Sequence, residues 1–320
     1  MKFKHIRNIF NLKKQYINGC VITIGNFDGV HLGHQKIISK LKNESLKRNL
    51  PMIVVIFEPQ PKEFINKNSP SRITGLRDKI KYFKKMGIKQ VLCINFNKNF
   101  LMLNAKDFIK NFLIKSLNMK CIIIGKDFRF GYKAYGDVKL LKNSGKKLGF
   151  NVLEVKTLEI DSEKISSTAI RNALKNNKLE KAIKFLGHEY SISGRVVCGK
   201  AIGRLIGFPT INISSKNIKF PINGVYAVEV NGITKKIIYG IANIGTRPTF
   251  FGLNQKVEVH LLNKSGNFYS CHIEIIIRKK IREERFFRST FDLKNQILYD
   301  INKVNDYFVY LKNKRKFFDE

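Results

Sequence analysis

Short apolar runs alternate with amphipathic stretches between residue 20 and about residue 155. The apolar runs have strand length and many β-branched residues, whereas the longer stretches repeat apolar side chains with a helical period. Strands that alternate with helices in this way predict a parallel sheet with crossover helices. The predicted strands are residues 21–24, 52–57, 90–94, 121–124 and 151–155, and the predicted helices are residues 35–47, 76–86, 105–117 and 137–148.

The pattern changes at Gly187, after two more helical stretches at residues 167–175 and 179–186. Beyond it, β-rich runs recur at short intervals between glycine-containing turns, which predicts a small closed antiparallel barrel. These runs are residues 190–197, 224–230, 236–241, 256–262 and 272–277, and residues 290–311 predict one or two C-terminal helices. We therefore expect an α/β plus β protein, with a Rossmann-like parallel-sheet domain at residues 1–187 and a small antiparallel β-barrel domain with a C-terminal helix at residues 188–320.

The composition agrees with a two-domain globular protein. A length of 320 residues leaves room for two cores, and a hydrophobic share of 43% is ordinary. No apolar run approaches the roughly 18 residues of a membrane span, and the basic N-terminus lacks the apolar core of a signal peptide. The five cysteines stand singly. They favour reduced thiols in the cytoplasm over a disulfide framework or a zinc ribbon.

The formal net charge of +36 raises the question of a polyanionic partner. The lysines are spread along the chain and form no single stripe. Abundant Lys, Asn, Ile and Phe together with the absence of Trp are typical of an AT-rich coding sequence. We therefore favour mutational bias and expect no specific nucleic-acid partner, with a basic polyanion-binding surface as the alternative.

The most specific chemistry lies in the stretch VITIGNFDGVHLGHQ, residues 21–35. A strand ends at Gly25, a turn follows at Asp28, and His31, Gly33 and His34 open a helix. Unpaired N–H groups at a helix N-terminus attract anions, so this arrangement predicts a nucleotide phosphate site faced by two imidazoles. Plain surface or core histidines are one alternative. Half of a metal site is another, although helical zinc pairs are usually spaced by four and need further ligands.

Three more segments offer side chains to the same nucleotide. Residues 57–61 (FEPQP) and 124–131 (IGKDFRFG) follow the second and fourth predicted strands, at the edge where a parallel sheet binds its ligands. Plain turns with core phenylalanines are the alternative for both. Residues 164–171 (KISSTAIR) offer hydroxyls and an arginine for phosphates, although such hydroxyls often serve only as helix caps. The candidate side chains are Phe57, Asp127, Phe130, Ser166, Thr168 and Arg171.

Residues 199–212 carry a second signal, GKAIGRLIGFPTIN. Gly199 and Gly203, with a third glycine four residues on, predict a loop that closes over phosphate through its N–H groups. Thr210 and Asn212, two apart on an extended strand, project to one side and offer hard oxygen ligands suited to Mg²⁺. A purely structural glycine turn is the alternative.

By the order of these motifs, the chain resembles the bacterial bifunctional riboflavin kinase/FMN adenylyltransferases, also called FAD synthetases, along nearly its whole length. The resemblance implies that riboflavin is phosphorylated to FMN with ATP, and that FMN is adenylylated with a second ATP to give FAD and pyrophosphate. HLGH and KISST also resemble the signature pair of class I aminoacyl-tRNA synthetases, but no room remains for a large anticodon-reading domain.

For the first domain, the resemblance implies that His31 and His34 donate hydrogen bonds to the α-phosphate of ATP as charge develops there. The family often carries an arginine before the Gly-Asp pair, whereas this chain reads YKAY at residues 132–135 before Gly136 and Asp137, with Lys133 as the candidate cation in its place. The implied nucleotide-binding residues are Gly25, Asp28, Gly33, Ser166, Thr168 and Arg171, the last three steadying pyrophosphate with Mg²⁺, and the implied flavin-binding residues are Phe57, Asp127 and Phe130.

For the second domain, the resemblance implies that Glu258 is the base for the ribityl 5′-hydroxyl, although a lone strand carboxylate is more often just exposed to solvent. Gly199 and Gly203 would bind ATP, Thr210 and Asn212 would hold its Mg²⁺, and Arg247 would lie on the flavin side. Three departures from the family pattern, Asn263, Lys264 and Ser270, leave a decayed kinase as an alternative. The rivals are therefore a monofunctional FMN adenylyltransferase with an inactive flavin-binding barrel and a basic polyanion-binding protein on a retired nucleotidyltransferase fold. ATP and flavins are the expected small-molecule partners, with no membrane partner and an oligomer possible.

Overall fold

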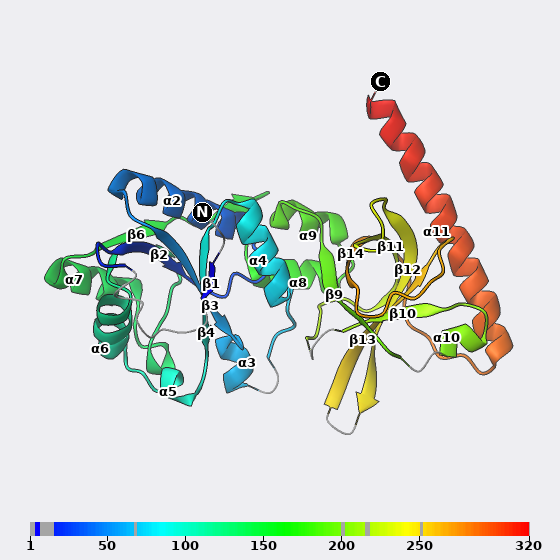
Figure 1. Ribbon diagram of the computed structural model, residues 1–320, viewed down its shortest axis with the longest axis horizontal. Helices are drawn as coiled ribbons and strands as arrows, with labels where there is room; N and C mark the ends of the chain where they lie inside the picture. Colours follow the sequence, from blue (N-terminus) through cyan, green and yellow to red (C-terminus); the bar gives the residue numbers. More distant parts are fainter. Residues whose placement is uncertain are drawn as a thin grey trace. The chain divides into compact units, whose positions relative to one another are not determined.

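The computed structural model describes residues 4–6, 16–66, 69–199, 202–214, 218–249 and 252–319. Its contacts divide the chain into two compact units (Figure 1). The first unit is Met1–Pro70 with Leu76–Ser167, and the second is Ser71–Gly75 with Thr168–Glu320. The compact units thus separate at residue 167, because the two helices that follow belong with the second unit. The functional boundary at residues 187/188 stays a prediction.

A six-stranded parallel sheet forms the first unit. Its strand order is β1 (Lys4–Ile6), β4 (Gln90–Asn95), β3 (Met52–Glu58), β2 (Cys20–Ile24), β5 (Met119–Gly125) and β6 (Asn151–Val155). All neighbouring strands run parallel. The five predicted strands are confirmed, and a sixth, β1, was not predicted, because its three residues are too few to show a period. Along β2, Val21 packs into one core cluster and Ile22 into the other, so both faces of the sheet are buried.

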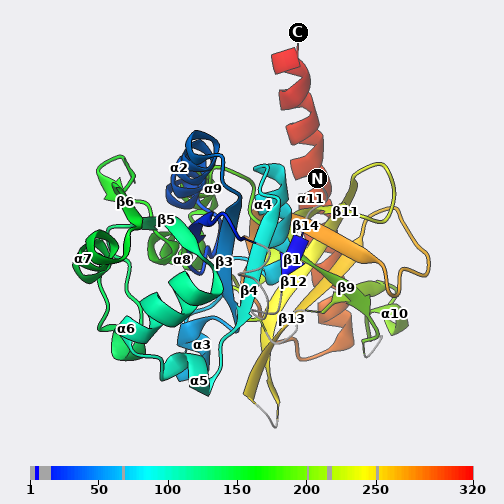
Figure 2. The ribbon, with the colours of Figure 1, turned by 60° about the vertical axis from the view of Figure 1, so that its left-hand side comes forward.

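Helices cover both faces of this sheet (Figures 1 and 2). On one face, α2 (Leu32–Arg48) and α4 (Leu76–Lys85) bury Ile38 and Phe83. On the other face, the π-helix η1 (Phe108–Ser116) and α7 (Val138–Leu148) bury Phe112 and Leu141. Shorter elements of this unit are α3 (Pro61–Ile65), α5 (Lys98–Leu101), η2 (Tyr132–Ala134), β7 (Glu159–Ile160) and β8 (Glu163–Lys164).

The helix expected at residues 105–117 begins with one α-helical turn, α6 (Ala105–Asp107), and continues as the π-helix η1. The predicted helical segment is therefore confirmed, although most of it is π-helical. An apolar period of three to four residues shows that a segment is helical, but it does not show which hydrogen bond closes each turn.

A closed six-stranded barrel forms the second unit (Figure 1). Its strand order is β10 (Thr210–Ile213), β13 (Gly252–Leu261), β12 (Ile238–Thr249), β11 (Gly224–Asn231), β14 (His272–Arg282) and β9 (Ser191–Val197), and β9 pairs with β10 to close it. All pairs are antiparallel, which confirms the predicted barrel. The remaining helices are α8 (Ser167–Lys175), α9 (Leu179–Leu186), α10 (Ile202–Leu205) and α11 (Thr290–Asp319).

One long helix, α11, follows the barrel, rather than two. Its side chains Val304 and Phe308 are buried against Val225 and Ala227 of β11. The ring of Phe308 stacks on Tyr239 of β12 with centroids 4.0 Å apart. Burial of these apolar groups anchors the middle of α11 to the barrel wall.

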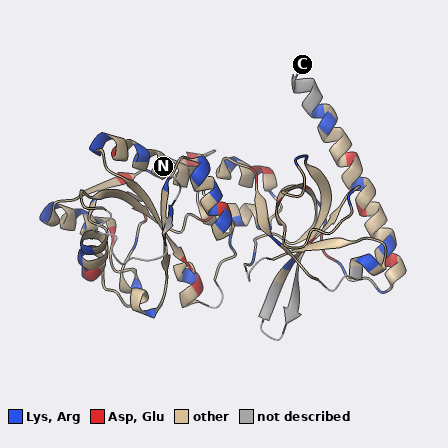
Figure 3. Ribbon diagram, in the orientation of Figure 1, with Lys and Arg blue, Asp and Glu red and all other residues tan. Residues whose placement is uncertain are grey.

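Lys and Arg are distributed over elements of both units and are not confined to one of them (Figure 3). Among the residues the structure describes, no helix has the length and apolar character needed to cross a membrane.

Candidate active sites

His31 and His34 lie where α2 begins, just beyond the carboxyl end of β2. His31 is the N-cap residue, with extended backbone angles, and its Nδ1 accepts a hydrogen bond from the backbone N–H of His34 at 3.4 Å. A neutral imidazole that accepts through Nδ1 carries its proton on Nε2. His31 is therefore oriented by the helix start to donate from Nε2.

The two imidazoles stack on each other, with ring centroids 3.6 Å apart and planes at 20°. Burial of His34, followed by the neighbouring His31 and Lys79, lowers the pKa of its imidazole well below the usual range. His34 is therefore neutral at physiological pH. Its Nδ1 is buried and has no hydrogen-bond partner among the described residues. A stacked pair of this kind can donate hydrogen bonds without burying two like charges.

The loop before α2 is held from two sides. Lys79 of α4 is only 1% exposed, and its Nζ donates to the carbonyl oxygen of Asn26 at 2.9 Å. Ser167 Oγ donates to the carbonyl oxygen of Asp28 at 2.9 Å. At Gly33, a Cβ would lie 3.2 Å from the His31 ring, so a side chain there would crowd the stacked pair. Sequence reasoning missed Lys79 and Ser167, since their contacts reach residues far away in the chain.

The KISST segment contributes differently from what its pattern suggested. Ser167, the neighbour of the predicted Ser166, donates its hydrogen bond to the loop before α2. Ser166 itself is half-buried. Thr168 is exposed, and Arg171 donates from Nε to the carbonyl oxygen of Ser71 at 2.6 Å, both within the second unit. The phosphate-binding roles of Ser166, Thr168 and Arg171 stay predictions.

The predicted flavin residues of the first unit are mostly core residues. Phe57 and Phe130 both belong to the cluster on one face of the sheet, and the ring centroid of Phe130 lies 5.1 Å from that of Phe108. Asp127 is exposed and forms an ion pair with Lys164, whose hydrogen bond and charge lower the pKa of the Asp127 carboxyl. The Phe57 and Phe130 side chains are buried, and the binding of a flavin here stays a prediction.

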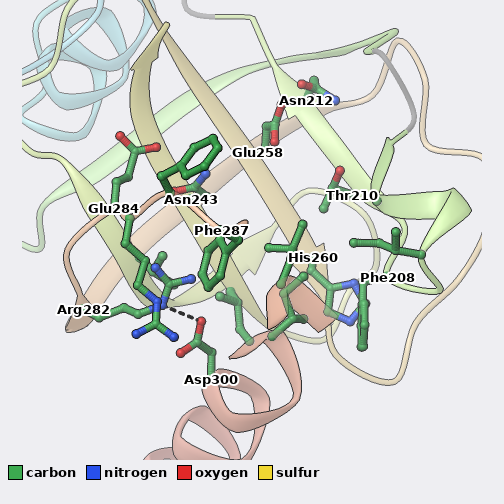
Figure 4. Close-up of a pocket in the computed structure, with 18 residues that line it drawn as sticks. Phe208, Thr210, Asn212, Asn243, Glu258, His260, Arg282, Glu284, Phe287 and Asp300 are labelled. Carbon is green, nitrogen blue, oxygen red and sulfur yellow. Dashed lines mark hydrogen bonds and ion pairs between the residues drawn. The ribbon is translucent and has the colours of Figure 1, made fainter. Parts of the chain in front are cut away.

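In the second unit, a cavity of about 760 Å³ lies between the outer face of the barrel strands and α11 with the segment that precedes this helix (Figure 4). It unites three of the predicted kinase residues, Thr210, Asn212 and Glu258, with Gly203. Strands β10, β12, β13 and β14, the segment after β14 and helix α11 all contribute to it. The other lining residues are Ile206, Phe208, Val225, Ile241, Asn243, His260, Arg282, Glu284, Arg285, Phe286, Phe287, Leu293, Ile297 and Asp300.

Strand register explains why these polar groups meet. Asn212 of β10 pairs with Glu258 of β13, and Glu258 pairs in turn with Asn243 of β12. Thr210 and His260 form the pair two positions away on the same face. The side chains of a strand alternate between its faces, so both pairs point into the cavity.

The glycine loop lies directly against the predicted metal ligands. A Cβ at Gly203 would overlap the carbonyl oxygen of Phe208 and lie 3.3 Å from Thr210 Oγ1, and a Cβ at Gly199 would overlap the amide of Asn212. Lys200 and Ala201 lie outside the described residues. Only glycine fits these two positions, so the backbone approaches both polar groups closely.

The residues present fit a magnesium–nucleotide complex. A hydroxyl, an amide oxygen and the Glu258 carboxylate are hard oxygen donors. In the described part of the chain, no group of three or more His, Cys, Asp or Glu residues could hold a metal by itself. Mg²⁺ usually takes few ligands from the protein and completes its shell with phosphates and water. The donor set around Thr210 and Asn212 matches that preference.

Sequence reasoning also missed the segment that covers one side of the cavity. Arg282 Nε donates to Asp300 Oδ2 at 2.8 Å, which joins the end of β14 to α11. The Phe287 ring lies between Arg282 and Arg285, whose guanidinium carbons are 5.6 and 4.8 Å from its centroid. In the sequence these residues form a short charged run without any period. The side chain of the predicted Arg247 lies outside the described part of the chain, although its backbone belongs to β12.

Comparison with known proteins gives matches over both units. Residues 13–169 match the family described as FAD synthetase, and residues 186–308 match the family described as riboflavin kinase. The bifunctional riboflavin kinase/FMN adenylyltransferase of Buchnera aphidicola subsp. Schizaphis graminum is 50% identical over 95% of this chain and 99% of its own length. The protein of the same name from Escherichia coli K12 is 46% identical over 95% of this chain and 98% of its own length.

A solved structure shares the fold. A crystal structure described as a macrolide-efflux protein from Streptococcus pneumoniae aligns with a TM-score of 0.77 at 28% identity. The alignment covers 95% of this chain and 99% of that one.

Proposed function

Since this chain belongs to the bifunctional riboflavin kinase/FMN adenylyltransferase family, we propose that its barrel unit phosphorylates riboflavin to FMN and its parallel-sheet unit adenylylates FMN to FAD. Each reaction uses one ATP. The observation that carries the proposal is that Asn212 and Glu258 are cross-strand neighbours that line the cavity together with Thr210. The segment with Gly199 and Gly203, the glycine loop, lies against Asn212 and Thr210.

In the kinase reaction, the 5′-hydroxyl of riboflavin attacks the γ-phosphorus of ATP and ADP leaves. Glu258 accepts the hydroxyl proton as the new O–P bond forms. The backbone of the glycine loop binds the phosphates, with Gly203 permitting its close approach. Mg²⁺, held by Thr210 and Asn212, would neutralise charge on the phosphates. The cavity wall keeps water away from the transferring group.

In the adenylyltransferase reaction, the phosphate of FMN attacks the α-phosphorus of ATP and pyrophosphate leaves. The attacking phosphate is already anionic, so no base is needed, and catalysis comes from positioning and charge stabilisation. His31 and His34 donate hydrogen bonds to the α-phosphate oxygens as negative charge develops. The start of α2 adds its N–H groups and its dipole.

The rival of a monofunctional adenylyltransferase is not favoured. The barrel keeps Gly203, Thr210, Asn212 and Glu258 together in one cavity. A protein that had lost kinase activity would be free to lose any of them. The alternative function, a polyanion-binding protein, is not favoured either. The Lys and Arg residues are spread over elements of both units (Figure 3).

We place the enzyme in the cytoplasm. Its five cysteines are all free, as expected for a reducing compartment, and ATP is supplied there. A homo-oligomer stays a prediction.

The test is to separate flavins by chromatography after incubating the full chain with ATP, Mg²⁺ and riboflavin, and in parallel with FMN. We expect FAD in both reactions and FMN as an intermediate in the first. FAD from FMN alone would mean that the barrel is not a kinase. No product in either would contradict both assignments.

A further inference from the structure

Asn243 of β12 carries a side-chain amide oxygen that no described residue satisfies. Its side-chain oxygen is buried and accepts no hydrogen bond in the described part of the chain. The side chain lines the barrel cavity together with Glu258 and Asn212 (Figure 4). A buried acceptor without a donor costs folding free energy, so a group of this kind facing a cavity points to a ligand that supplies the donor.

Strand register fixes where this amide lies relative to the predicted base. Glu258 is the cross-strand neighbour of Asn212 on one side and of Asn243 on the other. The row is visible in Figure 4, with Glu258 between the two amides. Gly199 and Gly203 lie against Asn212 and Thr210, so the nucleotide occupies the β10 side of Glu258.

An in-line phosphoryl transfer needs the attacking oxygen and the leaving oxygen on opposite sides of the phosphorus. With ATP on the β10 side, the alcohol approaches from the β12 side, where Asn243 lies. The atoms of riboflavin next to the 5′-hydroxyl are the other carbons of the ribityl chain, each with a secondary hydroxyl. On the basis of the proposed kinase function, we propose that Asn243 Oδ1 accepts a hydrogen bond from a secondary ribityl hydroxyl and so aligns the 5′-hydroxyl with Glu258.

The polarity of the cavity beyond Asn243 agrees with this assignment. The next cross-strand neighbour on β11 is Val225, and Ile241 lies two positions away on β12. Apolar side chains therefore follow Asn243 in the row, before Arg282 of β14, the next neighbour of Val225, whose guanidinium is paired with Asp300. Riboflavin has the same order of groups, with a hydroxyl-rich chain followed by a flat ring system.

The assignment makes Asn243 a determinant of specificity for the flavin side chain. A site built to bond a hydroxyl rejects an analogue that lacks it, because the polar group of the site is then left unpaired. A suitable probe is a flavin with a 5-hydroxypentyl chain at N10, which keeps the terminal hydroxyl and lacks the secondary ones. We expect wild-type kcat/KM to be about tenfold to a hundredfold lower for this probe than for riboflavin.

The test compares wild type with Asn243→Leu, which keeps the branching of the side chain and removes its polar atoms. In the variant, kcat/KM for riboflavin is expected to fall to about the value for the probe, while the KM for ATP is unchanged. Asn243→Ala serves as a second variant. Asn231→Leu on β11, outside the cavity, is the matched control, and the unchanged KM for ATP in the kinase reaction reports that the barrel is folded.

Two results would overturn the assignment while leaving the kinase function intact. One is wild-type enzyme that uses the probe as well as riboflavin. The other is Asn243→Leu lowering kcat/KM equally for both substrates, which would mean a packing role. If wild type makes no FMN at all, the proposed kinase function fails, and the assignment falls with it.

Discussion

At the scale of single residues, His31 has two roles that can be separated. It caps α2 through Nδ1, and it is proposed to donate to the α-phosphate through Nε2. His31→Asn keeps a good N-cap and removes the imidazole. We expect the initial rate of FAD formation from FMN to fall about 10²–10³-fold. FMN formation from riboflavin should be unchanged.

His31→Ala removes both roles. It should lose the same activity and also about 1 kcal/mol of stability, measured by denaturant unfolding. His188→Ala, in the second unit, is the matched control. Wild-type FAD formation in His31→Asn would contradict the catalytic role, whatever the stability of the protein.

Ser270 illustrates strain at one residue. Its φ of +66° lies in the left-handed region, where a Cβ is unfavourable. Ser270→Gly should therefore stabilise the protein by about 0.5–1 kcal/mol, measured as a shift of the urea midpoint. Asn263 has a φ of +54°, but asparagine tolerates this conformation, so Asn263→Gly should gain less. Equal shifts in the two variants would count against the explanation.

At the scale of elements, the kinase site depends on three strands in register. Glu258 faces the cavity because β13 lies between β10 and β12. Glu258→Gln keeps the shape of the side chain and removes its ability to accept a proton as a base. FMN formation should fall by about 10²–10⁴-fold, as measured by flavin chromatography. Adenylylation of supplied FMN should be unaffected, and a parallel loss of both activities would refute the separation of the two sites.

Helix α4 supports the adenylyltransferase site through Lys79. Lys79→Met removes the buried donor to the Asn26 carbonyl and should lower the free energy of unfolding by about 2 kcal/mol. FAD formation should fall at least about tenfold, because the loop before His31 loses an anchor. The positive charge of Lys79 helps to lower the pKa of His34, so its removal should raise that pKa, while burial keeps it below the ordinary value. An NMR titration of the histidine rings measures the shift, and an unchanged or lower His34 pKa would contradict it.

Much of the architecture was predictable because helices and strands repeat apolar residues at short, regular spacings along the sequence. The strands at 52–57 and 151–155 and the helices at 167–175 and 179–186 were confirmed within a residue. What could not be predicted depends on contacts between distant elements. Ser167 reaches Asp28, Lys79 reaches Asn26, and Arg282 reaches Asp300. The two residues of each pair lie far apart in the sequence, so no short sequence pattern predicts the contact. They meet only because the packing of the sheet or barrel brings their elements together.

The same limit applies within the candidate sites. Thr210 and Asn212 were identified because a two-residue spacing on a strand is local, and both line the cavity. Asn243 lies in a segment whose pattern resembles a flavin-side loop, but the position of its side chain beside Glu258 comes from cross-strand register and could not be read from the sequence. Phe130 had a local signal but a different position. Its motif predicted contact with a flavin ring, whereas the structure places its side chain in the core of the first unit.

At the scale of the whole molecule, the two units have separate cores and separate candidate sites. The activities should therefore complement each other between molecules. We expect His31→Asn to convert riboflavin to FMN only, and Glu258→Gln to convert supplied FMN to FAD only. Mixed in one tube with riboflavin, ATP and Mg²⁺, the two full-length variants should produce FAD after a lag in which FMN accumulates.

The lag follows from mass action, because FMN released by one protein must reach a useful concentration before the other binds it. Doubling the amount of His31→Asn should shorten the lag, and adding FMN at the start should abolish it. Each variant alone with riboflavin is the control and should make no FAD. If FMN accumulates in the mixture but no FAD forms, Glu258→Gln lacks adenylyltransferase activity, and the separation of the two sites is refuted.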